Sequence, residues 1–145
     1  MRRLNDIALA QGQPYRHPHW NRRDILIDRR LLEKHIELAT KRLVDYVSPL
    51  GWTDPGYERW YRSQLLLLVE SALPSGRRVL LVCPVCASLA CGFISANIEI
   101  RGDWATWSEL GTETEWSPDF EALGFLSFVF DLDAYRAALD GYGAA

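Results

Sequence analysis

The segment Ile94–Arg101 reads ISANIEIR and alternates apolar with polar side chains along its whole length. Successive side chains of a β-strand point to opposite faces of a sheet, so this pattern predicts a strand with one face in the core and one in water. Gly102-Asp103 follows as a turn, and Trp104–Leu110 is expected to return as the hairpin partner. The sequence therefore predicts an antiparallel sheet.

Two further strands and a terminal helix are predicted on either side of this hairpin. Val79–Val82 before it and Phe125–Phe130 after it are expected to be strands of the same sheet. The polar stretch Thr112–Pro118 is expected to be a loop. Asp131 is placed to cap a last helix over Leu132–Asp140.

The N-terminal half predicts two helices. Apolar residues recur every three or four positions over Arg29–Tyr46, and Asp28 is the candidate N-cap of that helix. The short apolar stretch Ile25–Ile27 before it is either a strand edge or the lead-in to the helix. A second helix is expected to open at Thr53-Asp54-Pro55, a capping residue followed by proline, and to end near Ala72.

Helices followed by strands with short connections are typical of the α+β class. We therefore predict an antiparallel sheet of about four strands in the C-terminal half, covered by the two N-terminal helices and the short C-terminal helix. With 145 residues, 48% hydrophobic and 24% charged, the composition suits one globular domain, which we place at residues 24–140. Residues 1–23 are expected to be an irregular N-terminal segment, and residues 141–145 a frayed tail.

Charge is divided unevenly along the chain. Residues 1–78 contain 14 Lys or Arg and 9 Asp or Glu, whereas residues 79–145 contain 2 and 10. This split predicts either a polar interaction surface or a basic helical layer that covers an acidic sheet. Because the sequence pI is near 5.6, nucleic acid is not expected as a partner.

Apolar runs such as Leu65–Val69 are far shorter than the roughly 20 residues of a membrane-spanning helix, so no membrane association is expected. Polar residues soon after Arg2 and Arg3 interrupt any signal peptide. Three cysteines, an odd number, cannot form a complete disulfide framework. Together these features predict a cytoplasmic location.

The three cysteines form the local pattern that can carry chemistry, because Cys83-Pro84-Val85-Cys86 is followed closely by Cys91-Gly92. Two thiolates separated by two residues can hold one metal ion, and Cys91 is the candidate third ligand. A tetrahedral zinc site would then need a fourth ligand, either a carboxylate or one of the three histidines, His17, His19 and His35.

Two other interpretations of the cysteines remain open. In a redox pair of the Cys-x-x-Cys type the nucleophile begins a helix that lowers its pKa. Gly92 and the strand after it follow Cys86 too closely for such a helix, although Cys91 would serve as a resolving thiol. In a packing role the cysteines act as small apolar side chains in a buried connection, which the neighbouring Ala87, Leu89 and Ala90 favour.

The cysteine segment and its surroundings resemble a family of uncharacterised bacterial proteins. The pieces that carry the resemblance are Ser75-Gly76-Arg77, Leu80–Cys86, Cys91-Gly92, Trp107, Phe128-x-Phe130-Asp131, Tyr135 and Ala138-Leu139. The family is similar over about residues 47–140, with a strand, a Cys-Pro-x-Cys turn, a strand pair and a C-terminal helix. Ala87-Ser88 stand where the family has Gly-Asp, and the resemblance implies no activity.

An acidic and aromatic segment lies further along the C-terminal half. Its candidate partner-binding residues are Glu109, Glu113, Glu115, Trp116, Asp119 and Phe120. Carboxylates steer association with a basic protein partner and aromatic side chains anchor it, as a bacterial immunity protein needs in order to neutralise a nuclease toxin. The alternative is a solvated loop whose aromatic side chains turn inward.

No nucleophile elbow, phosphate-binding glycine-rich loop or His-Glu-x-x-His segment occurs in the sequence, so no catalytic residue is assigned and an enzyme is not favoured. We therefore expect a non-enzymatic protein-binding module, such as an immunity or accessory protein, that acts through the acidic and aromatic segment. The second hypothesis is a small zinc- or thiol-dependent protein that uses Cys83, Cys86 and Cys91.

Overall fold

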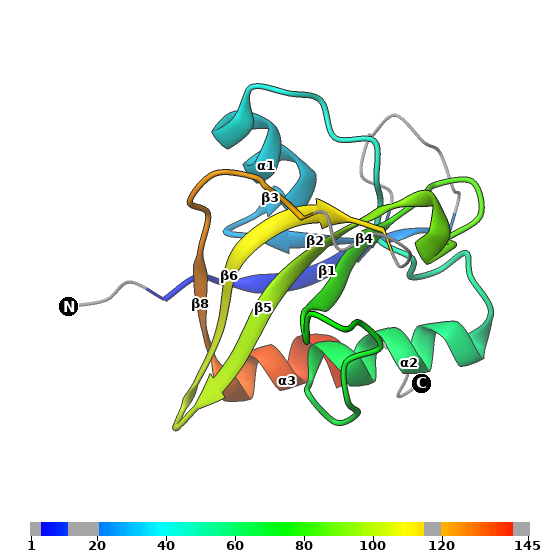
Figure 1. Cartoon of the computed structure of the whole chain (residues 1–145). Coiled ribbons are helices and arrows are strands. Elements are labelled where there is room, and N and C mark those ends of the chain that lie inside the picture. Colours follow the sequence, from blue (N-terminus) through cyan, green and yellow to red (C-terminus); the bar gives the residue numbers. More distant parts are fainter. Residues whose placement is uncertain (1–3, 12–20, 115–119, 141–145) are drawn as a thin grey trace.

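A computed structural model describes residues 4–11, 21–114 and 120–140, and it confirms the α+β class (Figure 1). The three-stranded sheet has the order β1 (Ile7–Gln11), β2 (Arg23–Ile27) and β3 (Arg30–Leu31). The five-stranded antiparallel sheet contains β4 (Arg78–Val82), β5 (Phe93–Arg101), β6 (Trp104–Glu113), β7 (Glu121–Ala122) and β8 (Phe128–Asp131). The helices are α1 (Leu32–Thr40), α2 (Pro55–Leu65), α3 (Leu132–Asp140) and the single 3₁₀ turn η1 (Leu89–Cys91). None of the described helices has the length and apolar character needed to cross a membrane.

The β5–β6 hairpin confirms the strand predicted from the alternating segment. Arg101 pairs with Trp104 across the Gly102-Asp103 turn. β6 runs beyond its predicted end at Leu110 to Glu113, because the far end of β6 pairs with the first residues of β5. The predicted loop therefore begins too early, at Thr112. The last strand, β8, begins three residues later than predicted and pairs with the near half of β6.

Ile25–Ile27 lies in β2, which confirms the strand alternative for that stretch, but β1 and β3 were not predicted. The expectation that residues 1–23 are irregular is wrong for Ile7–Gln11 and for Arg23. Ile7–Gln11 form β1, which pairs antiparallel with β2 from Ile7↔Ile27 to Gln11↔Arg23. Neither strand shows a strict period of two, so their pairing depends on partners separated in sequence rather than on a local pattern. Asn5 also joins this segment to the second sheet, because its backbone N–H donates to Val129 and its side chain accepts from the Val129 N–H.

The first helix is much shorter than predicted. Asp28 is not its N-cap: Asp28 and Arg29 both have positive φ, 52° and 66°, and form the tight turn between β2 and β3. The helix ends at Thr40 because Lys41 adopts the left-handed conformation at the C-cap. The Glu37 carboxylate accepts the Val44 N–H at 2.8 Å, which holds the following segment in a non-helical path.

The caps predicted for the other two helices are confirmed. The Asp54 side chain accepts from the Tyr57 N–H and the Asp131 side chain accepts from the Ala134 N–H, both at 2.9 Å. α2 ends at Leu65 rather than near Ala72, because Leu67 takes a left-handed φ of 58°. Figure 1 shows α2 and α3 together on one side of the curved β4–β5–β6 sheet and α1 on the other.

Trp107 is the centre of the aromatic core. Its ring makes edge contacts with Phe128, Phe130 and Tyr135, and all four side chains are buried. The Trp107 indole N–H donates to the Tyr135 hydroxyl at 3.1 Å, and that hydroxyl donates to the Leu65 carbonyl at 2.5 Å. The chain of bonds connects β6 to α3 and α3 to the end of α2, and it satisfies the polar atoms that these rings carry into the core.

Replacing Tyr135 with Phe tests this connection. Tyr135→Phe should lower the free energy of unfolding by about 2–3 kcal/mol, because it leaves the Trp107 N–H and the Leu65 carbonyl buried without partners. Tyr61→Phe is the graded comparison, since the Tyr61 hydroxyl donates to one buried carbonyl, that of Leu80. Urea unfolding followed by tryptophan fluorescence measures the free energy of unfolding of both variants. If Tyr135→Phe lowers it no more than Tyr61→Phe does, the hydrogen bond from the Trp107 N–H does not stabilise the fold.

Glu33, in the first turn of α1, is fully buried and neither carboxylate oxygen has a hydrogen-bond partner among the described residues. Burial, reinforced by the neighbouring Asp24 carboxylate, raises the pKa of Glu33 from 4.5 to about 8, although its own backbone N–H and then Arg22 oppose the shift. Arg22 and Asp24 are themselves a buried ion pair at 2.9 Å. Glu33 is therefore protonated in the native protein at neutral pH and ionised once the chain unfolds.

A pH dependence of stability follows from Glu33. Because the unfolded chain releases this proton above about pH 4.5 and the native protein keeps it to about pH 8, stability falls as the pH rises through that window. Glu33→Gln should remove this slope, leaving stability similar to wild type at pH 5 and higher than wild type at pH 8.5. Glu70→Gln, the same change at an exposed position, is the control in urea unfolding at each pH. Parallel pH profiles for wild type and Glu33→Gln would contradict the assignment.

Candidate metal centre

The three cysteines lie on the loop Cys83–Gly92, which leaves the end of β4 and returns at the start of β5. Val82 pairs with Phe93 across these two strands, so the register closes the loop at its base. Val82 also forms an isolated bridge with Val47 on its other side. The base of the loop is therefore held within the buried sheet, while its far end reaches the surface.

Hydrogen bonds fold the loop back on itself. The Ala87 N–H donates to the Cys83 carbonyl at 3.0 Å, and Ala87 takes a positive φ of 58°. The Tyr57 hydroxyl of α2 donates to the Ala87 carbonyl at 2.7 Å, which anchors the middle of the loop to the helix. Ser88 then caps η1, because its hydroxyl accepts from the Ala90 N–H.

Gly92 is required where the loop rejoins the sheet. Its φ is +91°, and a Cβ at this position would come within 2.8 Å of the Tyr46 hydroxyl. Any other residue would be strained by the backbone conformation, and the Tyr46 side chain would have to shift to make room for it. Cys91 therefore lies directly before a position where the backbone conformation favours glycine.

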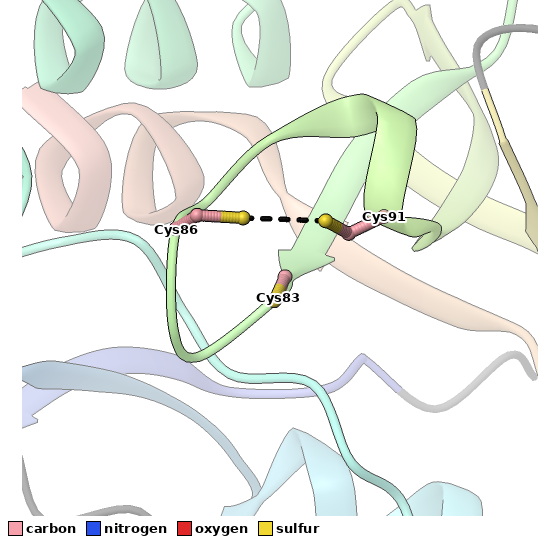
Figure 2. Close-up of side chains that lie close together, drawn as sticks. All are labelled: Cys83, Cys86 and Cys91. Atoms are coloured by element: carbon pink, nitrogen blue, oxygen red, sulfur yellow. Dashed lines mark hydrogen bonds between the residues drawn. The ribbon is translucent and has the colours of Figure 1, made fainter.

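The loop brings all three sulfur atoms together. They lie within 4.8 Å of one another, and the sulfurs of Cys86 and Cys91 are 3.3 Å apart. Figure 2 shows these two side chains pointing toward each other across the loop, with Cys83 beside them at the end of β4. Cys86 and Cys91 are exposed and Cys83 is half-buried, and none of the three is in a disulfide.

The two exposed thiols differ in acidity. The Ser88 backbone N–H, and secondly the Cys91 thiol, lower the pKa of Cys86 below its ordinary value. The same contact with Cys86 raises the pKa of Cys91 to about 11. Cys86 is thus the more readily formed thiolate, and thiolate rather than thiol is the form that binds metals and attacks electrophiles.

This geometry separates the three interpretations of the cysteine segment. The packing role is wrong for Cys86 and Cys91, because both side chains are exposed rather than buried. A thioredoxin-like helix does not follow Cys86, as predicted, because the next helical element is the three-residue 3₁₀ turn η1 at Leu89–Cys91. A three-cysteine cluster that can hold a metal ion is present in the turn between strands.

The predicted histidine ligands do not join this cluster in the described part of the chain. His35 is taken up elsewhere: its Nε2 lies 2.7 Å from the Ile27 carbonyl oxygen and its ring packs edge-on against Phe128. His17 and His19 lie outside the described residues. Among the residues that are described, the potential metal ligands are the three thiols.

Comparison of the chain with protein-family models, with curated proteins and with solved structures gives no match. The resemblance to a bacterial family therefore stays a prediction. What the structure supports is its central feature, a Cys83, Cys86 and Cys91 cluster in a turn between β4 and β5.

The predicted acidic and aromatic interface is only partly described by the structure. Glu115, Trp116 and Asp119 lie outside the described residues, and Glu109 and Phe120 are exposed. Glu113 does not belong to such a surface, because its side chain is buried and accepts a hydrogen bond from the Ser95 hydroxyl at 2.8 Å. Its carboxylate therefore forms a buried contact between β5 and β6.

Arg77 is the partner that the sequence analysis missed. Its Nε donates to the Ser95 hydroxyl at 3.0 Å and lies 3.8 Å from the Glu113 carboxylate, and a terminal nitrogen donates to the Glu109 carbonyl. The guanidinium also lies over the Phe120 ring, 3.9 Å from its centre. Arg77 belongs to the basic part of the chain and Glu113 to the acidic part, so this contact joins opposite charges from the two parts.

Arg77→Met should lower the free energy of unfolding by about 3 kcal/mol, because it leaves the buried Glu113 carboxylate without its cation. Adding Glu113→Gln to that variant should recover part of the loss, which urea unfolding of the single and double variants measures. Arg101→Met is the control, since Arg101 and Glu99 form an exposed pair expected to contribute below about 1 kcal/mol. Strictly additive losses at Arg77 and Glu113 would contradict the pairing.

Proposed function

We propose that this chain is a zinc-binding protein whose ligands are Cys83, Cys86 and Cys91. The observation that carries the proposal is the convergence of three sulfur atoms within 4.8 Å on one short loop. Exposed thiols have no packing requirement that would bring them together, because water can surround each of them separately. Shared coordination of one ion gives a physical reason for their arrangement.

The distances support a tetrahedral site. With a Zn–S bond of about 2.3 Å, two thiolates of a tetrahedral centre are about 3.8 Å apart. The sulfur separations in the loop run from 3.3 Å between Cys86 and Cys91 to no more than 4.8 Å. They therefore differ from the tetrahedral value by about 1 Å or less, which rotation of the side chains would correct.

The donor set supports zinc over the hard cations. Thiolates are soft ligands that select zinc and related metals, whereas magnesium and calcium take oxygen ligands. No carboxylate of the described chain joins the cluster. Three protein ligands leave one position of the tetrahedron for water or for another molecule, which is the arrangement of zinc sites that act on a ligand rather than only hold a fold.

Metal analysis of untagged protein tests the proposal. Protein that is reduced, loaded with zinc and dialysed should retain one zinc ion per chain by mass spectrometry of the metal. Replacement of zinc by cobalt should give the charge-transfer absorption of a cobalt–thiolate site. Single Cys83→Ser, Cys86→Ser and Cys91→Ser variants should each lose zinc on dialysis, because two thiolates hold the ion too weakly.

His35→Gln is the matched control, since it removes the described histidine that lies outside the cluster and should leave zinc retention unchanged. Tryptophan fluorescence and circular dichroism establish that each variant is folded. Folded wild-type protein with three reduced thiols that retains no zinc would refute the function. Zinc retained equally by all three cysteine variants would place the metal elsewhere.

The protein-binding hypothesis retains less support. Glu113 is buried, and Phe120 packs between the Arg77 guanidinium and the backbone of Gly111, where a Cβ would meet its ring at 2.2 Å. Both residues therefore have a structural role in the sheet. An immunity or accessory role remains a prediction that rests on the other residues of that segment.

A further inference from the structure

All three sulfurs lie within 4.8 Å of one another, and the direct contact that the structure shows is between Cys86 and Cys91. Their sulfurs are in direct contact at 3.3 Å, and both side chains are exposed. Cys83 is half-buried and fixed to the end of β4, beside the hydrogen-bonded pair Val82↔Phe93. Figure 2 shows the Cys86 and Cys91 sulfurs directed at each other from opposite sides of the loop.

We propose that Cys86 and Cys91 are a reactive thiol pair that a hydroperoxide converts to a disulfide, while Cys83 remains a thiol. A disulfide bond is about 2.05 Å long, so the two sulfurs must approach by only about 1 Å. Rotation of the two cysteine side chains can supply this movement, because both are exposed. The Cys83 side chain is half-buried, so it has less room to rotate.

The reaction takes two steps. The Cys86 thiolate attacks one oxygen of the hydroperoxide, so that an S–O bond forms, the O–O bond breaks and the leaving alkoxide or hydroxide takes up a proton. Cys86 is then a sulfenic acid. The Cys91 thiol loses its proton and attacks the Cys86 sulfur, the S–S bond forms, the S–O bond breaks and water leaves. The two sulfurs lose two electrons in total, and the peroxide gains two.

For the metal centre the consequence is loss of the ion. A disulfide between Cys86 and Cys91 removes two of the three thiolates, and Cys83 alone cannot hold zinc. This part of the inference rests on the proposed function, whereas the disulfide itself does not. The two are therefore tested on different forms of the protein.

The first experiment uses the reduced full-length protein after removal of metal by a chelator. One equivalent of hydrogen peroxide should produce a monomeric product that has lost two hydrogen atoms by intact mass. The three cysteines fall in one tryptic peptide, because no Lys or Arg occurs between Val79 and Ile100. Free thiols must therefore be alkylated before digestion and located by fragmentation, and the label is expected on Cys83 alone.

Variants identify the roles of the individual thiols. Metal-free Cys83→Ser should form the disulfide as wild type does. Cys91→Ser should instead accumulate a sulfenic acid on Cys86, which dimedone traps. A disulfide that includes Cys83, or a folded wild-type protein that forms no intramolecular disulfide with peroxide, would overturn the inference.

The second experiment adds peroxide to zinc-loaded protein and follows zinc release with a chromogenic chelator. Release should proceed together with the loss of two thiols, and a subsequent thiol reductant should restore binding. If the protein retains zinc but peroxide forms no Cys86–Cys91 disulfide, the inference fails and the function stands. If it binds no zinc but the metal-free disulfide forms as expected, the function fails and the thiol pair stands.

Discussion

The pairing of Val82 with Phe93 is the constraint on which the candidate site depends. This pair joins the end of β4 to the start of β5. The two ends of the loop between them are therefore held at the spacing of neighbouring strands. β4 is held on its other side through Val47 and from below by α2. The closed loop keeps its residues near one another, and in our proposal shared coordination of one ion is what draws the three thiols together.

The same sheet uses its other polar groups to hold itself together. The Trp107–Tyr135–Leu65 series of hydrogen bonds connects the sheet to both covering helices, and the Arg77–Ser95–Glu113 group joins β6, β5 and the residue before β4. Buried groups of this kind must be paired, because an unpaired polar atom in the core is costly. They make a rigid base, whereas the thiols stand on an exposed loop where ligands can reach them.

The local patterns identified some elements well and missed others for a physical reason. The alternation in Ile94–Arg101 predicted β5, and Asp54 and Asp131 predicted two helix starts, because strand faces and caps depend on neighbours in sequence. β1 was missed, since its partner β2 is separated from it along the chain and neither strand alternates. The helix predicted over Arg29–Tyr46 was cut short by the Glu37–Val44 contact, which competes with helical continuation.

For the candidate site, the sequence by itself determined which atoms are available: three thiols at fixed spacing, a proline after the first and a glycine after the last. It also determined that the segment joins two strands. Only the tertiary structure decided that Cys86 and Cys91 face solvent and each other, and that Glu113 faces Arg77 inside the sheet. The exposure of a side chain and its contact partners depend on the elements that pack against it. Tyr57, Val47 and Arg77 each come from another element of the fold, so no local pattern could reveal them.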